Sequence, residues 1–266
     1  MGYGVHPDVT SLESFYSSET GQIAGQLVSR RLRMAWPNIR GGQLLGVGYA
    51  TPFLSPFKEA ERLVATMPAS QGVIPWPEGE LNCSALTEDT CLPFADRSFD
   101  YIIVCHALEH SARPQPFMRE LWRVLTDNGR IIVIVPNRQG IWTFLDRTPF
   151  GSGRPYSSTQ LSQLMNDTLF TSISLHPALF FPPIGSRVLS TWAQGMENVG
   201  SHWFSQFSGV LIIEACKQIY AVPRPEHAKV RHGIALGISE RVHLERKGKT
   251  ASFSEFLRNW GVSNRK

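Results

Sequence analysis

Residues 99–105 read F-D-Y-I-I-V-C, a largely apolar run rich in β-branched side chains. Such a run is typical of a strand covered on both faces, because a strand with one wet face alternates polar and apolar residues. Residues 130–135, R-I-I-V-I-V, repeat the pattern. Between the two runs, apolar residues recur at the spacing of a helix that should stop at Asn128-Gly129; they are Phe117, Leu121, Val124 and Leu125. The sequence therefore predicts two buried, parallel strands joined by a helix.

The alternation of strands and helices continues on both sides of this unit. Upstream, the sequence predicts a strand at 43–48, a helix at about 56–63, a strand at 62–67 and a short strand near 81–86. Downstream, Ser157 and Gln160 have the spacing of a capping box for a further helix, and a last strand is expected at about 210–221. This order predicts an α/β, Rossmann-like fold, in which a doubly wound, mostly parallel sheet lies between two layers of helices.

The composition and charge suggest one large domain with additions at both ends. The chain has 266 residues, of which 42% are apolar, enough for a sizeable core. We expect an N-terminal helical lead at 1–39, one α/β domain of the size of an enzyme at 40–221 with an aromatic-rich insertion at 176–207, and a tail at 222–266. From Arg224 onward the chain holds ten Lys or Arg and four Asp or Glu, which is a net charge of +6. The whole chain has a net charge of +4, so the residues before Arg224 carry −2. Such a tail could contact an acidic partner, nucleic acid or anionic lipid, or be a solvated end.

The sequence favours a reduced, cytoplasmic protein. Its first residues lack a secretory pattern, and no apolar run approaches the roughly 18 residues that a membrane helix needs. We therefore expect no transmembrane segment. The four cysteines form no C-x-x-C pair, and Cys105 falls inside a predicted buried strand, which indicates structural thiols.

A glycine loop follows the first predicted strand, where residues 46–48 read G-V-G. A strand that ends in Gly-x-Gly often lets a nucleotide-type ligand lie against bare backbone. The nicotinamide and flavin fingerprint is incomplete, because Thr51 stands at its third glycine and Met67 at its acidic residue. A phosphate-binding P-loop is also missing from the sequence. The loop by itself leaves two interpretations open: a site for another ligand, or a tight turn that holds none.

The order of motifs downstream resembles class I S-adenosylmethionine-dependent methyltransferases over residues 40–136. These motifs are L-P-F at 92–94, S-F-D at 98–100, H-A-L-E-H at 106–110, R-E-L-W-R-V-L at 119–125 and N-G-R at 128–130. The similarity is to the small-molecule branch that includes quinone-biosynthesis enzymes, and the stretch after Pro136 resembles a bacterial subgroup of unknown substrate. The resemblance implies S-adenosyl-L-methionine as cofactor and methyl transfer to a small-molecule or lipid-like acceptor.

The resemblance also implies a set of cofactor contacts. The glycine loop would pass under the methionine part, the second strand would end at the ribose, the region before residue 92 would meet the adenine, and the fourth strand would end at the sulfonium. In that order, the implied residues are Gly46, Val47, Gly48, Tyr49 and Ala50; Met67; Glu88 and Asp89; and Cys105, His106 and Ala107.

Two acidic anchors of the family are missing, because neither Gly46 nor Met67 is a carboxylate. A hydrogen bond to a charged group is worth about 1.5–3 kcal/mol, so the loss weakens the expected hold on the cofactor. The chain is therefore a methyltransferase or, alternatively, a non-catalytic protein of this fold that senses the cofactor or binds a partner. We expect an acidic residue at position 67 to strengthen cofactor binding, and a side chain at Gly48 to obstruct the cofactor more than the fold.

His106 and His110 are the candidate general bases, because imidazole titrates near neutral pH. Capping and packing of the next helix are their alternative roles, and methyl transfer needs no metal. Arg138, Arg154 and Tyr156 lie in a loop rich in Gly and Pro, where they could bind an anionic substrate or brace the loop. No D/N-P-P-Y/F signature follows the fourth strand, which argues against methylation of exocyclic amines in DNA.

Overall fold

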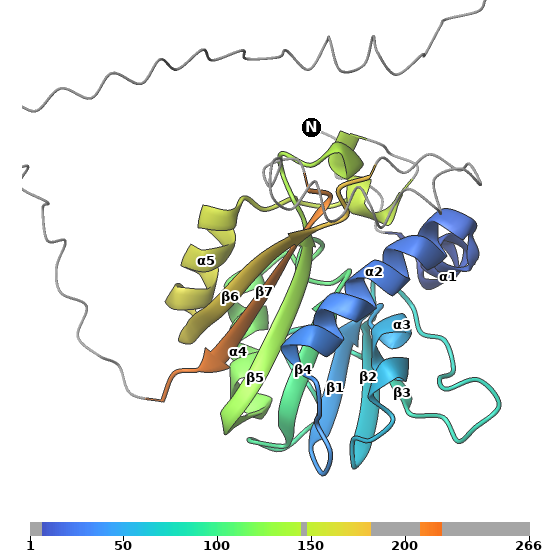
Figure 1. The fold of residues 1–266 in the computed structure, drawn as a ribbon. Coiled ribbons are helices and arrows are strands. Elements are labelled where there is room, and N and C mark those ends of the chain that lie inside the picture. Colours follow the sequence, from blue (N-terminus) through green and yellow to red (C-terminus); the bar gives the residue numbers. More distant parts are fainter. Residues whose placement is uncertain (1–6, 145–147, 182–207, 220–266) are drawn as a thin grey trace, which may run out of the picture. The chain divides into compact units, whose positions relative to one another are not determined.

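The computed structural model describes residues 7–144, 148–181 and 208–219, which form a seven-stranded sheet with helices on both faces (Figure 1). The strand order is β3-β2-β1-β4-β5-β7-β6, in which β7 is antiparallel to both neighbours and the other pairs are parallel. The strands are β1 (Gln43–Gly48), β2 (Arg62–Pro68), β3 (Ser84–Thr87), β4 (Phe99–Cys105), β5 (Leu125–Pro136), β6 (Phe170–Ala178) and β7 (Val210–Lys217). The helices are α1 (Val9–Ser17), α2 (Glu19–Ala35), α3 (Thr51–Leu54), α4 (Pro114–Val124) and α5 (Ser158–Asp167), with short 3-10 helices η1 (Ser55–Phe57), η2 (Ile141–Phe144) and η3 (Pro149–Gly151). The predicted doubly wound α/β fold is confirmed.

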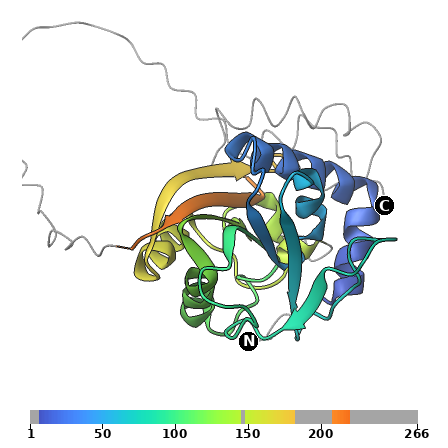
Figure 2. The ribbon, with the colours of Figure 1, turned by 90° about the horizontal axis from the view of Figure 1, so that it is seen from below.

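Two apolar layers bury the two faces of the sheet. Residues of α1, α2 and α3 pack in one layer and residues of α4 and α5 in the other (Figures 1 and 2). Successive residues of β4 enter opposite layers, since Ile103 belongs to the first and Ile102 and Val104 to the second. Because side chains alternate across a strand, both faces of β4 must be apolar. This arrangement explains the unbroken apolar run at 99–105.

The helix predicted at about 56–63 is wrong in its position. The chain becomes helical at Thr51, directly after the glycine loop, with Pro52 in the first turn of α3. Proline is well tolerated there, because its missing N–H has no partner in a first turn anyway. The segment continues as η1 and gives way to β2 at Arg62.

The helix stop predicted at Asn128-Gly129 is also wrong. Helix α4 ends at Val124, and the next residue, Leu125, is extended and pairs with Phe99 of β4. Leu125 is fully buried, so pairing and burial favour the strand at this point. The Asn-Gly pair therefore lies inside β5, within the irregular part of its pairing with β4, between Leu125, which pairs with Phe99, and Arg130, which pairs with Tyr101.

The helix predicted from its capping box is confirmed as α5. The Ser157 hydroxyl oxygen accepts a hydrogen bond from the backbone N–H of Gln160, and the Gln160 side-chain oxygen accepts one from the backbone N–H of Ser157. Both bonds satisfy amide groups that the start of a helix leaves without partners.

Much of the predicted insertion and the whole basic tail lie outside the described residues. Residues 176–178 belong to β6, and residues 182–207 are outside the description. The chain divides into two compact units, Met1–Val222 and Pro223–Lys266, and the second is entirely outside it. Within the described ranges, no helix combines the length and the apolar character that a membrane crossing requires.

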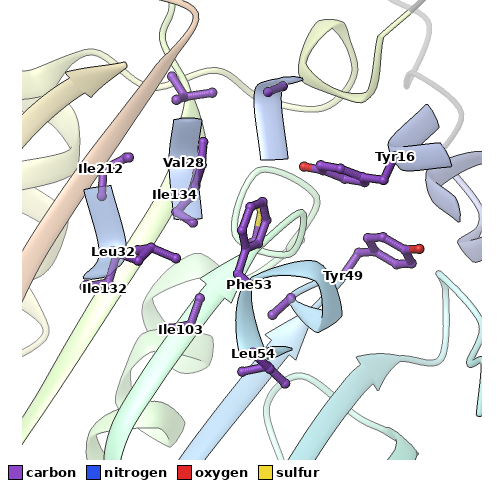
Figure 3. Packing of buried hydrophobic residues seen from close by; sticks show 14 of the residues in the cluster. Tyr16, Val28, Leu32, Tyr49, Phe53, Leu54, Ile103, Ile132, Ile134 and Ile212 are labelled. Carbon is purple, nitrogen blue, oxygen red and sulfur yellow. The ribbon is translucent and has the colours of Figure 1, made fainter. Parts of the chain in front are cut away.

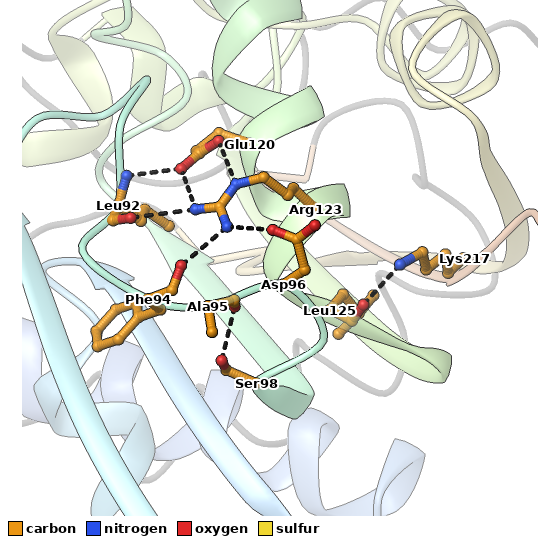
Figure 4. A network of polar contacts seen from close by, with 9 residues as sticks. All are labelled: Leu92, Phe94, Ala95, Asp96, Ser98, Glu120, Arg123, Leu125 and Lys217. Atoms are coloured by element: carbon orange, nitrogen blue, oxygen red, sulfur yellow. Dashed lines mark hydrogen bonds and ion pairs between the residues drawn. The ribbon is translucent and has the colours of Figure 1, made fainter.

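Arg123 of α4 ties this helix to the loop before β4 (Figure 4). Its guanidinium donates to both carboxylate oxygens of Glu120, to Asp96 Oδ1 and to the backbone carbonyls of Leu92 and Phe94, at 2.6–3.1 Å. A guanidinium has five N–H donors, so each one has an acceptor here. We refer to these five residues as the arginine clamp. It gives the motifs at 92–94 and 119–125 a structural role.

Candidate functional site

The carboxyl ends of β1, β2 and β4 meet at one edge of the sheet, where open α/β sheets bind their ligands. β1 lies between the other two strands. Helix α1 reaches the same edge, since the backbone N–H of Val9 donates to the carbonyl oxygen of Gln71 in the turn after β2 (2.8 Å). We refer to the region formed by Gly48, Gln71, His106 and Tyr16 as the strand-end site.

The glycine loop packs against the protein itself. A Cβ built on Gly46 would lie 2.7 Å from Leu54 Cδ1, and one on Gly48 would overlap the carbonyl oxygen of Cys105 and lie 2.8 Å from Cβ of Ala107. Gly48 also has a φ of +78°, which residues with a Cβ rarely adopt. The turn itself requires a glycine at position 48, whereas at Gly46 the nearest obstacle is the end of the Leu54 side chain. These contacts argue against the expectation that a side chain at Gly48 would largely spare the fold.

The other predicted loop residues are buried. Tyr49, Ala50 and Met67 lie in the same apolar layer as α1 and α2, and Val47 lies in the opposite layer. Met67 has no exposed surface at all. A carboxylate at position 67 would lie among apolar side chains, which is costly without a partner. This burial argues against the expectation that an acidic residue there would strengthen cofactor binding.

His106 is the centre of a buried polar cluster at the end of β4. Its Nε2 lies 2.8 Å from the hydroxyl oxygen of Tyr16, and its Nδ1 lies 3.3 Å from Glu109 Oε1. Its backbone carbonyl accepts a hydrogen bond from Gln71 Nε2 (2.8 Å). His106 has a φ of +52°, and such uncommon backbone conformations gather at functional sites. We refer to Tyr16, Gln71, His106 and Glu109 as the His106 cluster.

Aromatic rings enclose this cluster. The ring of Tyr16 stacks on Tyr49, with centroids 5.6 Å apart, and meets Phe53 edge to face at 5.7 Å (Figure 3). On another side, Phe150 lies 4.8 Å from the His106 ring between centroids. Because these rings exclude water, charges within the cluster interact strongly.

Burial by itself would lower the pKa of His106, since the imidazolium loses its hydration. The neighbouring Cys105 thiol and Glu109 carboxylate outweigh that effect, and the pKa of His106 is raised. Burial acts to raise the pKa of Glu109, but the contact with His106, aided by the charge of His110, lowers it overall. At neutral pH the pair is therefore an imidazolium beside a carboxylate. An imidazolium accepts no proton, so this charge state argues against His106 as the general base. The general-base roles of His106 and His110 stay predictions.

Three acceptor atoms of the His106 cluster are buried without a hydrogen-bond partner among the described residues. They are Gln71 Oε1 and both carboxylate oxygens of Glu109, one of which forms the ion pair with His106. Buried polar atoms are normally hydrogen-bonded. Unsatisfied groups together with perturbed pKa values are typical of functional sites.

The residues predicted to meet the adenine lie outside this cluster. Asp89 Oδ2 accepts a hydrogen bond from the hydroxyl of Ser111, in the turn after β4 (2.8 Å). Glu88 is exposed and forms an isolated bridge with Cys91. Their role toward the cofactor stays a prediction.

A groove of about 470 Å³ lies between α4, α5 and the loop that follows η3. The predicted substrate residues Arg154 and Tyr156 line it, whereas Arg138 does not. The backbone N–H of Arg154 donates to the carbonyl oxygen of Glu109 (2.8 Å), so the groove adjoins the His106 cluster. The other polar residues that line it are Arg113, Gln115, Gln160, Gln163 and Asp167.

Sequence reasoning missed three residues of this region: Tyr16, Gln71 and Arg113. Gln71 had a weak signal, because it follows the second strand closely, near the place of the missing ribose carboxylate. Tyr16 had none, since 90 positions separate it from His106. Only the folded chain brings these residues together.

Comparisons with known proteins agree with this fold. Residues 45–133 match the methyltransferase domain family. The structure is similar to a SAM-dependent methyltransferase from Thermotoga maritima, described as a possible histamine N-methyltransferase, with 16% identity, a TM-score of 0.54, and 79% of this chain and 96% of that chain covered. It is also similar to SAM-dependent methyltransferases from Aquifex aeolicus (13% identity, TM-score 0.53, 78% and 97% covered) and Archaeoglobus fulgidus (17% identity, TM-score 0.52, 77% and 97% covered). No curated protein matches the sequence.

The fold is that of class I methyltransferases, and S-adenosyl-L-methionine is the cofactor that the matched domain family indicates. The strand-end site offers this cofactor acceptor atoms on Gln71 and Glu109 that have no hydrogen-bond partner within the described part of the chain. The side chains of Tyr16 and Gln71 nevertheless fill the region, and Tyr49 and His106 are at most 4% exposed. The residues therefore fit the cofactor only in an arrangement in which Tyr16 and Gln71 lie elsewhere.

Proposed function

We propose that the protein transfers the methyl group of S-adenosyl-L-methionine to a small, polar acceptor that carries a carboxylate or phosphate. The observation that supports this most is the groove beside the His106 cluster. Two guanidinium groups, those of Arg113 and Arg154, line it together with one carboxylate, that of Asp167. Guanidinium groups match the planar, bidentate geometry of carboxylates and phosphates.

The charged groups of the groove favour an anionic acceptor over a neutral, lipid-like one. Besides the charged groups, the lining contains the side chains of Gln115, Gln160 and Gln163, which offer both donors and acceptors. Pro114, Pro116, Pro155 and Leu164 form the apolar part of the lining. The two guanidinium groups, and not an overall polar surface, are what favour an anionic acceptor over a neutral one.

The test is methyl transfer from radiolabelled S-adenosyl-L-methionine to paired acceptors, each with and without its anionic group. We expect the anionic member of a pair to be preferred, and Arg154→Gln to raise its KM at least tenfold, because charged hydrogen bonds are lost. Arg119→Gln is the matched control, since Arg119 is exposed on α4 and does not line the groove. Equal use of the neutral acceptors, or equal effects of both substitutions, would exclude the groove as the acceptor site.

A non-catalytic role is the second candidate, favoured by the absence of carboxylates at Gly46 and Met67. Titration calorimetry separates an enzyme that binds the cofactor from a scaffold that binds only a partner. Binding of S-adenosylhomocysteine tighter than about 100 µM, or about −5.5 kcal/mol, supports the enzyme. Absence of binding under the same conditions supports a scaffold that uses the fold to bind a partner.

A further inference from the structure

We propose that α1 is a cover over the cofactor place, and that Tyr16 and Gln71 must leave His106 before the cofactor binds. This inference rests on the proposed function, because it takes the strand-end site as the place of the cofactor. The two side chains reach the same histidine from separate elements: Tyr16 from α1, ahead of the first strand, and Gln71 from the turn after β2.

The side chain of Gln71 spans the carboxyl end of β1. Gln71 follows β2, His106 follows β4, and β1 is the strand between them. The 2.8 Å hydrogen bond from Gln71 Nε2 to the carbonyl oxygen of His106 therefore bridges the two strands that flank the glycine loop. A ligand of an open α/β sheet lies across these same strand ends. The amide and the cofactor consequently compete for one place.

Tyr16 closes the same place from α1. Its hydroxyl contacts His106, and its ring contacts the side chains of Tyr49, from the glycine loop, and Phe53, from α3 (Figure 3). Tyr49 is one of the residues implied to touch the cofactor, and Tyr16 covers its ring by stacking. The cofactor can reach Tyr49 from this side only when Tyr16 moves.

Helix α1 is too short to be stable as an isolated helix, so its contacts with the rest of the protein keep it folded. It has nine residues, and isolated helices shorter than about 12–15 residues are marginal in water. Its buried side chains are Val9, Leu12 and Tyr16. Ser18, which has an extended ψ of 157°, separates it from α2 and caps both helices.

The two helices are anchored at different places. Helix α1 is held by the hydrogen bond from the backbone N–H of Val9 to the carbonyl oxygen of Gln71 and by the contact between Tyr16 and His106, which both involve the strand-end site, and α2 is held away from it. At the end of α2, the indole N–H of Trp36 donates to Glu214 Oε1 of β7 (2.9 Å), and both side chains are buried. The extended residue at Ser18 can therefore act as a hinge, since hinges are short segments between rigid elements. α1 moves while α2 stays on the sheet.

Release of Tyr16 exposes acceptors that suit the cofactor. Gln71 Oε1 and the carboxylate oxygens of Glu109 have no hydrogen-bond partners among the described residues. The ribose hydroxyls and the ammonium group of S-adenosyl-L-methionine are donors that such atoms accept. Gln71, near the end of β2, then supplies the ribose acceptor that Met67 cannot.

The test compares Tyr16→Phe, which keeps the ring and removes the hydroxyl contact, with Ser14→Ala, which removes an exposed hydroxyl from the same helix. Titration calorimetry with S-adenosylhomocysteine measures binding without turnover. We expect Tyr16→Phe to bind it about fivefold more tightly, because one hydrogen bond that holds the cover closed is lost. Ser14→Ala should bind as the wild type does. In wild-type protein, hydrogen exchange of the amides at 12–17 should become faster when S-adenosylhomocysteine is added.

Weaker binding by Tyr16→Phe together with slower exchange in α1 would show that Tyr16 helps to bind the cofactor. That result would contradict the proposal that α1 blocks the site. Binding with unchanged affinity and unchanged exchange would overturn it as well. If no variant binds S-adenosylhomocysteine, the proposed function fails and the cover fails with it. If Tyr16→Phe does not fold, the exchange of α1 in the wild type decides the matter alone.

Discussion

The arginine clamp and the His106 cluster are both polar networks next to β4, but they differ in how completely their groups are satisfied. In the clamp, every N–H of Arg123 has an acceptor, and the side chain is one-third exposed, at 33%. In the His106 cluster, the side chains of His106 and Glu109 are 0% and 1% exposed, and three acceptor atoms have no hydrogen-bond partner in the part of the chain that the structure describes. A satisfied network is sufficiently explained by the fold, whereas a buried, unsatisfied one points to chemistry or a ligand.

This difference separates two kinds of motif. The segments at 92–94 and 119–125 carry much of the resemblance to methyltransferases, yet the structure uses them to hold α4 against the loop before β4. The candidate site instead combines H-A-L-E at 106–109 with Tyr16 and Gln71, which belong to no motif. Motifs therefore locate the fold better than they locate its chemistry.

The largest expected effect comes from Met67→Glu, which tests how tightly the strand-end site is packed. It places a carboxylate in a fully buried apolar position, and an unpaired buried charge costs about 3–5 kcal/mol. Urea unfolding should show this loss. Met67→Leu, of similar volume, is the control and should cost less than about 1.5 kcal/mol. A stable Met67→Glu protein with tighter cofactor binding would restore the view that this position faces the ribose.

Gly48→Ala should reduce the free energy of unfolding by about 3 kcal/mol, because strain at positive φ adds to overlap with the backbone of residue 105. Gly41→Ala is a matched control, since Gly41 has a φ of +76° but no atom within 4 Å of the added Cβ. It should show only the strain, about 1–2 kcal/mol. Equal losses in thermal or urea unfolding would mean that the loop at Gly48 can yield to a side chain.

Arg123→Leu should cost about 2 kcal/mol of stability, less than a buried network would, because the guanidinium is partly solvated. The affinity for S-adenosylhomocysteine should stay unchanged if the clamp serves the fold alone. Arg119→Leu, at an exposed position on the same helix, should stay within about 0.5 kcal/mol of wild type. A loss of affinity out of proportion to stability would give the clamp a functional role.

The most gradual effect, spread over several pH units, is the pH dependence that His106 contributes. The pKa of His106 is raised in the folded protein, so its contribution is fully present below the usual value of about 6.5. It is lost as pH rises toward the folded value, by at most about 1.4 kcal/mol per pH unit. Urea unfolding between pH 6 and 9 should show this decline in wild type and not in His106→Gln. Parallel pH profiles of the two proteins would mean that His106 is not held as an imidazolium.

Local patterns in the sequence determined the layered fold and most strand positions. The runs at 99–105 and 130–135 are buried on both faces, and the capping box at Ser157 forms as expected, because neighbouring residues decide both features. The cytoplasmic location, the basic tail and the domain limits at 40 and 221 stay predictions.

Only the tertiary structure decided what the strand ends hold. It brings Tyr16 to His106 across 90 positions, buries Met67 in the core, and fills the space beside both glycines with the side chain of Leu54 and the backbone of Cys105. No periodicity or motif encodes such contacts, because they depend on how α1 and the turns after β2 and β4 meet at one edge of the sheet. The sequence could therefore mark the strand ends as the expected place of the cofactor, but it could not show that the chain's own side chains lie there.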